Sequence, residues 1–505
     1  MKTNSKIVPE RKASVFREVY PIHEPYVYAA VVTEPNSNRI TYELIEPTLL
    51  QEEEEQLKEI KAILVEELDV NLKEIGTREK AEEYLKAKIR EIIKDYRLKI
   101  DEEAVDKLTY YIIRDFLGYG KIDPLMQDPL IEDISTDGVN IPIYVWHRDY
   151  ESLPTNILFP NSTELNSFIV RLAYLAKKNI SLAMPLLDAS LPDGSRIQMT
   201  YGSEITRRGS TFTIRRFRVD PLTISDLISL GTISSEMAAY FWYAIENRAS
   251  ILVSGGIASG KTTILNCFSM FIKPGLKLVS VEDTAELNLP HENWIPSVAR
   301  TGFGDAGNRA GAITLFDLLK AAVRQRPDYL LVGEVRGEEA YTLFQAMATG
   351  HLGMGTIHGE SASSVIHRLG SEPMNIPKPL LTMIDAITVQ LRTEINGKPV
   401  RRTRAVTEII GLDPKTRELI TNEVYRWDAR NDTFEYSGHS HILEEKMNRK
   451  GLNEKEVREE LHKRKTVLDW MVKKGIRKYT DVVSVIRDYY ADPTRVFRKA
   501  RLGTS

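Results

Sequence analysis

The spacing of apolar residues changes several times along the chain, and each change predicts a different kind of element. Residues 1–50 are punctuated by prolines and contain β-branched runs such as 28–32, which predicts a small, partly extended segment. In residues 51–117, Leu, Ile and Val recur every three or four positions among charged residues, which is typical of amphipathic helices. We take residues 1–117 together as an N-terminal segment.

Residues 118–220 combine strand and helix patterns. Short apolar runs predict strands at 131–134, 143–145, 196–200 and 211–217. The polar stretch 161–164 offers N-cap residues for a helix that continues to about Lys178. We therefore expect an α+β domain that ends near Asp220 and Pro221.

Beyond that boundary, apolar strand-like runs alternate with helical patterns. The runs lie at 251–253, 278–281, 329–332, 386–391 and 405–410. Such alternation predicts an α/β domain with a largely parallel, doubly wound sheet, which we assign to residues 221–435. Residues 436–505 look helical and carry seventeen Lys and Arg against ten Asp and Glu. This basic extension is either a solvated helical face or a docking surface for a partner or an acidic membrane.

Composition excludes several classes of protein. With 42% hydrophobic and 28% charged residues, the chain is an ordinary globular protein. Its net charge of −3 argues against a protein that coats nucleic acid. The single cysteine, Cys267, excludes a disulfide framework and a four-cysteine zinc site. We see neither a secretory leader nor a membrane-spanning run, and expect a cytoplasmic protein with at most a peripheral membrane role.

The most specific motif is a glycine-rich loop that fits G-x-x-x-x-G-K-[ST] at every fixed position. An apolar strand-like run precedes it and a helix-compatible run follows it, which is the setting that a phosphate-binding loop requires. Its backbone N–H groups and the positive end of the next helix would hold an anion. We expect Lys261 to reach the β- and γ-phosphates of ATP and the Thr262 hydroxyl to bind Mg²⁺. The alternative is a glycine-rich turn with an exposed lysine. The candidate nucleotide-binding set is Gly255, Gly256, Ile257, Ala258, Ser259, Gly260, Lys261, Thr262 and Thr263.

Two acidic positions follow strand-like runs, at the edge of the sheet where ligands bind in such folds. Glu334 closes the run 329–332, and we expect it to orient the attacking water, directly or through the Mg²⁺ shell. Glu282 and Asp283 close the run 278–281, and we assign them to the metal shell or the water network. The alternative for all of them is the capping of a following helix.

Two histidines, His351 and His358, form a further polar group seven residues apart. Gly353 and Gly355 between them argue against a single helix. We favour one of them, His358 in our candidate set, as a residue that responds to the terminal phosphate. A zinc pair without an evident third ligand, or a purely structural histidine, remains open.

Arginines are dense just before the α/β domain. On the predicted strand 211–217, alternation places Phe212 and Ile214 on one face and Thr213 and Arg215 on the other. We take Arg196 and Arg215 as candidate arginine fingers that reach a nucleotide from another domain or subunit. A solvated basic strand or a nucleic-acid patch would have the same composition.

The order of these motifs resembles the secretion ATPase superfamily, which includes the motors of type II and type IV secretion, type IV pili and the archaellum. The resemblance covers about residues 115–435, including the stretch Leu191-Pro192-Asp193-Gly194-Ser195-Arg196. It implies a RecA-like P-loop ATPase core and a hexameric ring in which ATP and Mg²⁺ lie between each core and its N-terminal domain. By matching positions, it implies an acidic box at Glu282 and Asp283, a Walker B glutamate at Glu334 and a histidine box at His351 and His358.

The chain departs from the bacterial type II members in two respects. It lacks their four-cysteine insert, and Asp317 and Lys320 stand where we would align arginines of those proteins. The N-terminal extension and basic C-terminus resemble the archaeal branch. The expected function is a hexameric ATPase motor at the inner face of the membrane that powers secretion or assembly of pilin-like subunits through a polytopic platform protein. For this motor we expect no stably bound nucleic acid. The alternatives are an archaellum motor acting on archaellins, a RecA-like nucleic-acid translocase, and a nucleotide-gated scaffold.

Overall fold

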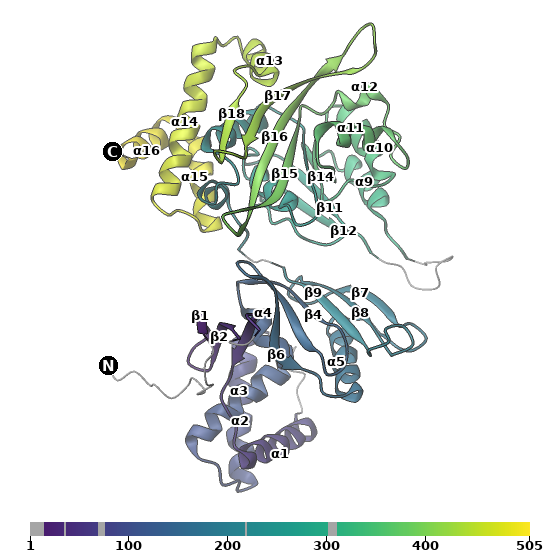
Figure 1. The fold of residues 1–505 in the computed structure, drawn as a ribbon, viewed down its shortest axis with the longest axis vertical. Coiled ribbons are helices and arrows are strands. Elements are labelled where there is room, and N and C mark those ends of the chain that lie inside the picture. Colours follow the sequence, from purple (N-terminus) through teal and green to yellow (C-terminus); the bar gives the residue numbers. More distant parts are fainter. Residues whose placement is uncertain (1–14, 35–36, 69–75, 218–219, 301–310, 505) are drawn as a thin grey trace. The chain divides into compact units, whose positions relative to one another are not determined.

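The computed structural model describes residues 15–34, 37–68, 76–217, 220–300 and 311–504. The chain forms two compact units, one up to Phe217 and one comprising the rest, which we call the N-terminal and C-terminal units (Figure 1). The four-part division expected from the sequence is finer than these two units, and it stays a prediction.

A nine-stranded sheet forms the body of the N-terminal unit. Its neighbouring strands are antiparallel except where β3 meets β6 through the pair Tyr42 and Thr155. The segment 1–50, expected to be partly extended, supplies three of the strands within its described residues. In spatial order the strands are β1 (Val15–His23), β2 (Val27–Thr33), β3 (Ile40–Ile45), β6 (Glu151–Leu158), β5 (Pro142–His147), β4 (Ile131–Thr136), β9 (Thr211–Arg215), β8 (Arg196–Thr200) and β7 (Leu186–Ser190).

The helices predicted for residues 51–117 form a small bundle with a core of its own, in which Ile60, Leu85 and Leu108 are fully buried. They are α1 (Gln51–Glu67), α2 (Arg78–Asp95) and α3 (Glu102–Phe116). A short 3-10 turn, η2 (Gly120–Ile122), and α4 (Asp123–Gln127) lead into the sheet. Helix α5 (Ser162–Leu175) begins where predicted, because the Asn161 side chain accepts a hydrogen bond from the Glu164 backbone N–H.

The C-terminal unit contains the expected doubly wound sheet, also nine-stranded. The strands from β12 to β15 are parallel, and those from β15 to β18 are antiparallel. The spatial order is β12 (Trp294–Val298), β11 (Leu278–Glu282), β13 (Tyr329–Val332), β14 (Leu352–His358), β10 (Ile251–Gly255), β15 (Ala386–Ile395), β16 (Lys398–Leu412), β17 (Leu419–Asp428) and β18 (Thr433–Tyr436).

The sheet is parallel only in part, which the expectation of a largely parallel sheet allows. The run 405–410 lies in β16, which pairs antiparallel with β15. The reason is the two-residue turn Asn396-Gly397, in which both residues have positive φ angles, 53° and 74°. Such turns join hairpins because their twist matches that of the strands.

Helices cover both faces of this sheet, as a doubly wound fold requires. Alternate strand residues divide between two cores, so that Ile251 and Val253 contribute to one and Leu252 to the other. The helices are α6 (Ile224–Ser229), α7 (Ser235–Glu246), α8 (Lys261–Ser269), α9 (Leu315–Arg324), α10 (Glu339–Ala348), α11 (Ala362–Gly370), α12 (Lys378–Leu381), α13 (His441–Lys450), α14 (Glu454–Lys473), α15 (Tyr479–Ala491) and α16 (Pro493–Thr504).

The helices after residue 436 pack into the larger of these cores. Val467, Met471 and Tyr489 belong to it together with Trp242 of α7. A buried carboxylate helps to hold the extension in place. Glu408 of β16 accepts hydrogen bonds from the Ser440 hydroxyl (2.5 Å) and the His441 backbone N–H (2.7 Å), at the start of α13. The basic extension is therefore part of the C-terminal unit's core. In the parts of the chain that the structure describes, no helix is long and apolar enough to cross a membrane.

Candidate nucleotide-binding site

The glycine-rich loop starts at the centre of the parallel sheet. Strand β10 is buried along its whole length, and its last residue, Gly255, lies between His358 of β14 and Gln390 of β15. Gly255 has a φ of +151°, and a Cβ there would lie 2.4 Å from the Gln390 carbonyl oxygen. A side chain at this position would collide with the backbone of the neighbouring strand, so the loop requires glycine here.

The loop then curls into helix α8. Ala258 and Gly260 take positive φ angles, +56° and +89°, and Lys261 is the first helical residue. Such left-handed residues turn successive backbone N–H groups toward one side, which makes a concave anion site at a helix N-terminus. The Ile257 side chain is 84% exposed at the tip, and Ser259 is buried beneath it.

The Lys261 side chain lies across the loop. Its Nζ donates a hydrogen bond to the Gly256 carbonyl oxygen at 2.7 Å, and the Ser259 hydroxyl donates to the same oxygen at 2.9 Å. Burial lowers the pKa of Lys261, and the negative charge of Glu334 acts against this shift. The ammonium group is thus half-buried, held by a neutral carbonyl and electrostatically coupled to Glu334. It can exchange that carbonyl for a phosphate oxygen.

Glu334 and His358 meet at the carboxyl edge of the sheet. Glu334 follows β13, and His358 Nε2 lies 3.2 Å from its Oε1. Burial, and then the charge of Lys261, lower the pKa of His358. A neutral imidazole is therefore favoured at pH 7, and its ring N–H can donate to the carboxylate and fix its orientation. The sequence placed these residues near the loop, and the structure joins Glu334 to both His358 and Lys261.

Glu282 and Asp283 have partners within the protein. Glu282 is buried, and its Oε1 accepts hydrogen bonds from the backbone N–H groups of Glu286 and Leu287, each at 3.0 Å. Burial raises its pKa to about 7. Asp283 forms an ion pair of 2.5 Å with Arg336, which lies two residues after Glu334. In this structure Glu282 holds the loop that follows β11, and a role of either acid in a metal shell stays a prediction.

The structure decides two of the alternatives. Helix α10 begins at Glu339 with Glu338 as its N-cap residue, so Glu334 does not cap it. His351 Nδ1 lies 3.2 Å from the Ala346 carbonyl oxygen, at the end of α10, so this ring has a backbone neighbour within the C-terminal unit, and its role stays a prediction. Among the described residues, no group of three or more His, Cys, Asp or Glu could hold a metal ion. A zinc pair of histidines therefore gains no third ligand there.

The remaining residues suit magnesium bound together with a nucleotide. Mg²⁺ in such sites is held by one or two protein oxygens, phosphate oxygens and water rather than by a protein cage. Thr262 and Thr263 lie in the first turn of α8 and are partly buried beside the loop. Thr262 would supply its hydroxyl to Mg²⁺ and Glu334 a carboxylate to the surrounding shell.

The candidate arginine fingers lie side by side in the N-terminal unit. Arg196 of β8 is directly opposite Arg215 of β9. Their side chains are 50% and 65% exposed, on the face of the sheet opposite to the buried Phe212 and Ile214. Arg215 Nε lies 3.3 Å from Asp133, and Arg196 lies 4.0 Å from Asp188. The predicted alternation is therefore present, and the reach of these arginines to a nucleotide stays a prediction.

Sequence reasoning missed three residues around the loop. Arg401 of β16 donates from Nε to the Ala258 carbonyl oxygen at 3.0 Å, Gln390 supplies the backbone beside Gly255, and Arg336 pairs with Asp283. Arg401 and Gln390 lie far along the chain from the loop, so no local pattern connects them to it. The hairpin turn after β15 is the signal that could have placed Arg401.

Comparison with known proteins agrees with this geometry. The family described as "Type II/IV secretion system protein" matches residues 120–423. This chain belongs to that family. A second family, "PilB3-like, C-terminal", matches residues 430–503. Family membership confirms the expected resemblance, and the sheet topology confirms the α/β fold class, with an N-terminal part and a helical C-terminal part.

Some similar proteins match almost the whole chain, and others match about half of it. An uncharacterized protein of Methanocaldococcus jannaschii, MJ0900, is 34% identical over 96% of this chain and 92% of its own length. The conjugal transfer protein TrbB of Rhizobium radiobacter is 32% identical over 45% of this chain and 68% of its own. Among solved structures, the VirB11 ATPase of the Brucella suis type IV secretion system is 22% identical, with a TM-score of 0.29, and covers 56% of this chain and 90% of its own. The pilus retraction motor PilT with bound ADP is 23% identical, with a TM-score of 0.40, over 57% of this chain and 81% of its own.

Proposed function

We propose that this protein binds ATP with Mg²⁺ at the loop 255–262, hydrolyses it, and acts as the motor of a secretion or pilus-type machine. The observation that carries the proposal is the joint position of Lys261, Glu334 and His358 at the carboxyl edge of the sheet, in a chain of the secretion family. ATPases such as VirB11 are among the proteins that it resembles.

In the proposed reaction the loop amides and Lys261 hold the β- and γ-phosphates. When bound, Mg²⁺ neutralises charge on the phosphate oxygens. Glu334 accepts a hydrogen bond from the attacking water and orients it toward the γ-phosphorus. His358 would hold the Glu334 carboxylate in place. Because His358 also pairs with Gly255, the last residue of β10, it would respond to the state of the loop.

Arg196 and Arg215 complete the site in this proposal, supplied by an N-terminal unit that closes over the phosphates in a homo-hexameric ring. Because those contacts would exist only with the γ-phosphate present, hydrolysis would release the N-terminal unit and change its angle to the core. The movement would act on a polytopic membrane platform protein and, through it, on pilin-like subunits. The protein would work in the cytoplasm, at the inner face of the membrane.

The test of the chemistry is the ATPase activity of Glu334→Gln. We expect nucleotide binding to be kept and turnover to fall by about 10²-fold or more, since the carboxylate that orients water is lost. Glu338→Gln is the matched control, because Glu338 is an exposed carboxylate four residues away whose side chain makes no capping hydrogen bond to α10. Unchanged turnover in Glu334→Gln would remove the catalytic assignment.

The test of the motor is the dependence of activity on protein concentration. A ring in which one subunit completes its neighbour's site predicts that turnover per subunit rises steeply as the chain assembles. Activity strictly proportional to protein, with a monomer in sedimentation, would contradict it.

Added DNA or RNA should leave the rate unchanged, and stimulation with a strong salt dependence would favour a translocase. An archaellum motor would share this chemistry and differ in the subunits encoded beside it.

A further inference from the structure

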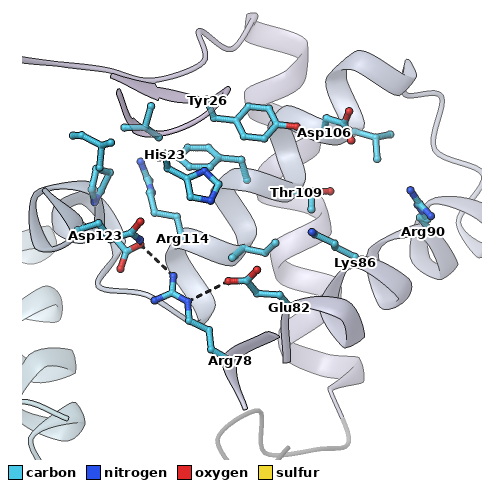
Figure 2. A pocket seen from close by; sticks show the side chains of 17 residues that line it. His23, Tyr26, Arg78, Glu82, Lys86, Arg90, Asp106, Thr109, Arg114 and Asp123 are labelled. Carbon is cyan, nitrogen blue, oxygen red and sulfur yellow. Dashed lines mark hydrogen bonds and ion pairs between the residues drawn. The ribbon is translucent and has the colours of Figure 1, made fainter. Parts of the chain in front are cut away.

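The N-terminal unit contains a cavity of about 290 Å³ that no part of the proposed ATPase reaction uses. Helix α2 forms one wall with residues at successive intervals of four positions, helix α3 forms the second wall, and the β1–β2 turn and α4 close it (Figure 2). Its volume is near the lower end of small-molecule pockets, which run from about 300 to 1,000 Å³. All of its lining residues lie between 22 and 127, so the cavity is separate from the glycine-rich loop.

Charged side chains at one end of the cavity neutralise one another. Arg78 lies 3.1 Å from Glu82 and 3.7 Å from Asp123, as the dashed lines of Figure 2 show. Arg114 pairs with Glu46 and Asp115 outside the cavity, at 2.8 Å each. These ion pairs leave little charge free for a ligand at this end.

Two cations at the other end differ from these. Lys86 and Arg90 follow Arg78 on the same face of α2 and line the cavity. Within the described part of the chain, neither has an ion pair or a side-chain hydrogen bond. Both side chains are exposed, so they can bind an anion without breaking a native contact. Figure 2 shows Asp106 and Thr109 of α3 on the opposite wall.

An aromatic pair forms the remaining wall. The rings of Tyr26 and Tyr110 stack with centroids 5.8 Å apart and planes 26° apart. The Tyr110 hydroxyl donates to Glu46 at 2.6 Å, which fixes its ring. Figure 2 shows the Tyr26 hydroxyl directed toward Asp106, and burial followed by the Asp106 charge raises the pKa of Tyr26. Both tyrosines thus contribute ring atoms to the cavity lining, and Asp106 lies beside them as an acceptor.

We propose that this cavity is a second ligand site, for a small molecule that combines a phosphate group with a flat ring, in the class of the nucleoside monophosphates. The phosphate would bind Lys86 and Arg90, the ring would pack against the wall of Tyr26 and Tyr110, and Asp106 and Thr109 would bond its N–H or O–H groups. Two adjacent cations favour a doubly charged group, and aromatic side chains favour stacking with a flat ring. The inference goes beyond the proposed ATPase function and does not depend on it.

The test is calorimetric titration of the full chain with AMP, GMP or inorganic phosphate at low salt, in a Lys261→Ala background that weakens binding at the glycine-rich loop. We expect one site per chain for a mononucleotide. Replacing Lys86 and Arg90 together by Ala should weaken binding at least tenfold. Lys80→Ala with Lys94→Ala is the matched control, because both are exposed cations of α2 outside the cavity and should leave affinity unchanged.

Three results would overturn the proposal. The first is the lack of any binding heat up to millimolar mononucleotide. The second is equal affinity in the Lys86, Arg90 and control variants, since binding would then lie elsewhere. The third is that inorganic phosphate binds as tightly as AMP and that Tyr26→Ala leaves the affinity for AMP unchanged. The ring of the ligand would then contribute nothing to binding. Circular dichroism and thermal melting of every variant would show that the α2–α3 bundle still folds.

Discussion

At the scale of single residues, Glu282 shows how burial makes a carboxylate sensitive to pH. Its folded-state pKa of about 7 is above the ordinary value of 4.5. The folded state therefore binds a proton more tightly, and this contribution to stability is complete below pH 4.5 and lost as pH rises through 7. A shift of this size corresponds to up to about 3 kcal/mol.

We therefore expect Glu282→Gln to remove this pH dependence and to be more stable than the native chain at pH 8. Gln keeps an oxygen that accepts the backbone N–H groups of Glu286 and Leu287. Glu292→Gln, an exposed position of the same loop, is the control. Thermal unfolding at pH 5 and 8, followed by tryptophan fluorescence, measures the effect. The prediction is contradicted if, between pH 5 and 8, the unfolding temperature of the native chain falls no further than that of Glu282→Gln.

Two neighbouring glycines of the loop should respond differently to the same substitution. Gly255→Ala places a methyl group 2.4 Å from the Gln390 carbonyl oxygen at a φ of +151°, which we expect to cost about 1–3 kcal/mol. A Cβ on Gly256 meets no atom within 4 Å, so Gly256→Ala should cost under about 1 kcal/mol. Chemical unfolding of both variants gives the comparison, and equal losses would show that the collision is relieved by movement of β15.

The residues of the loop could be predicted because their chemistry is local. Gly255 to Thr262 are consecutive, and strand, turn and helix signals surround them in the sequence. The contacts of Glu282 with the Glu286 and Leu287 amides could not be predicted, because they depend on how a loop without regular structure folds back. The contact of Arg401 with Ala258 was missed because it depends on strand order as well as on the hairpin turn after β15.

At the scale of elements, the strongly apolar central strands were the most predictable. β10, β11 and β13 coincide with short, mainly apolar runs, which are typical of buried parallel strands. The glycine-rich β14 gave a weak strand signal. Gly353 and Gly355 are small because Met347 and the Val332 carbonyl oxygen lie where their Cβ atoms would be, at 2.5 and 3.0 Å. Close packing thus requires glycine at these two positions, where β-branched or aromatic residues would have predicted the strand.

Helix α14 is anchored by a buried arginine that the sequence does not distinguish from its neighbours. Arg464 is buried between Glu246 and Glu460 and lies over the rings of Tyr243 and Tyr489. Arg464→Ala would leave Glu246 without this partner, and we expect it to cost about 3–5 kcal/mol. Arg458→Ala removes an exposed pair with Glu454 on the same helix and should cost under about 1 kcal/mol.

Hydrogen exchange of α14 to α16 measures this difference, because local opening of the extension would raise exchange there first. Faster exchange in Arg464→Ala and native exchange in Arg458→Ala are the expected results. Similar protection in both variants would mean that the other contacts of the extension, including the apolar ones of Val467, Leu468 and Met471, hold it without Arg464.

At the scale of the whole molecule, the candidate arginine fingers and the glycine-rich loop belong to different units. If Arg196 and Arg215 act on the transferred phosphate, replacing both by Ala should lower turnover by about 10³-fold or more and leave nucleotide affinity nearly unchanged. Arg207→Ala is the control, because Arg207 is an exposed arginine on the β8–β9 turn of the same unit. Turnover kept within twofold in the double variant would identify the pair as an exposed basic surface and nothing more.

The order of motifs predicted the family, and the hydrophobic pattern predicted an α/β core. Neither could predict that the basic C-terminal helices complete that core, because their apolar faces are narrow and their charges dominate the pattern. Similarly, the extended segment before residue 50 gave no sign that it joins the N-terminal sheet through a single parallel pair, Tyr42 with Thr155.

The attachment of the C-terminal helices has a consequence for anyone who wishes to isolate a minimal catalytic core. Asp385, which receives the Ser250 backbone N–H at 2.7 Å where β10 begins, has the buried ammonium of Lys446 3.7 Å away. Glu408 likewise depends on donors from residues 440 and 441. A protein shortened at residue 435 would leave both acids without these partners near the start of β10, the strand that ends in Gly255. We therefore expect truncation to destabilise the glycine-rich loop.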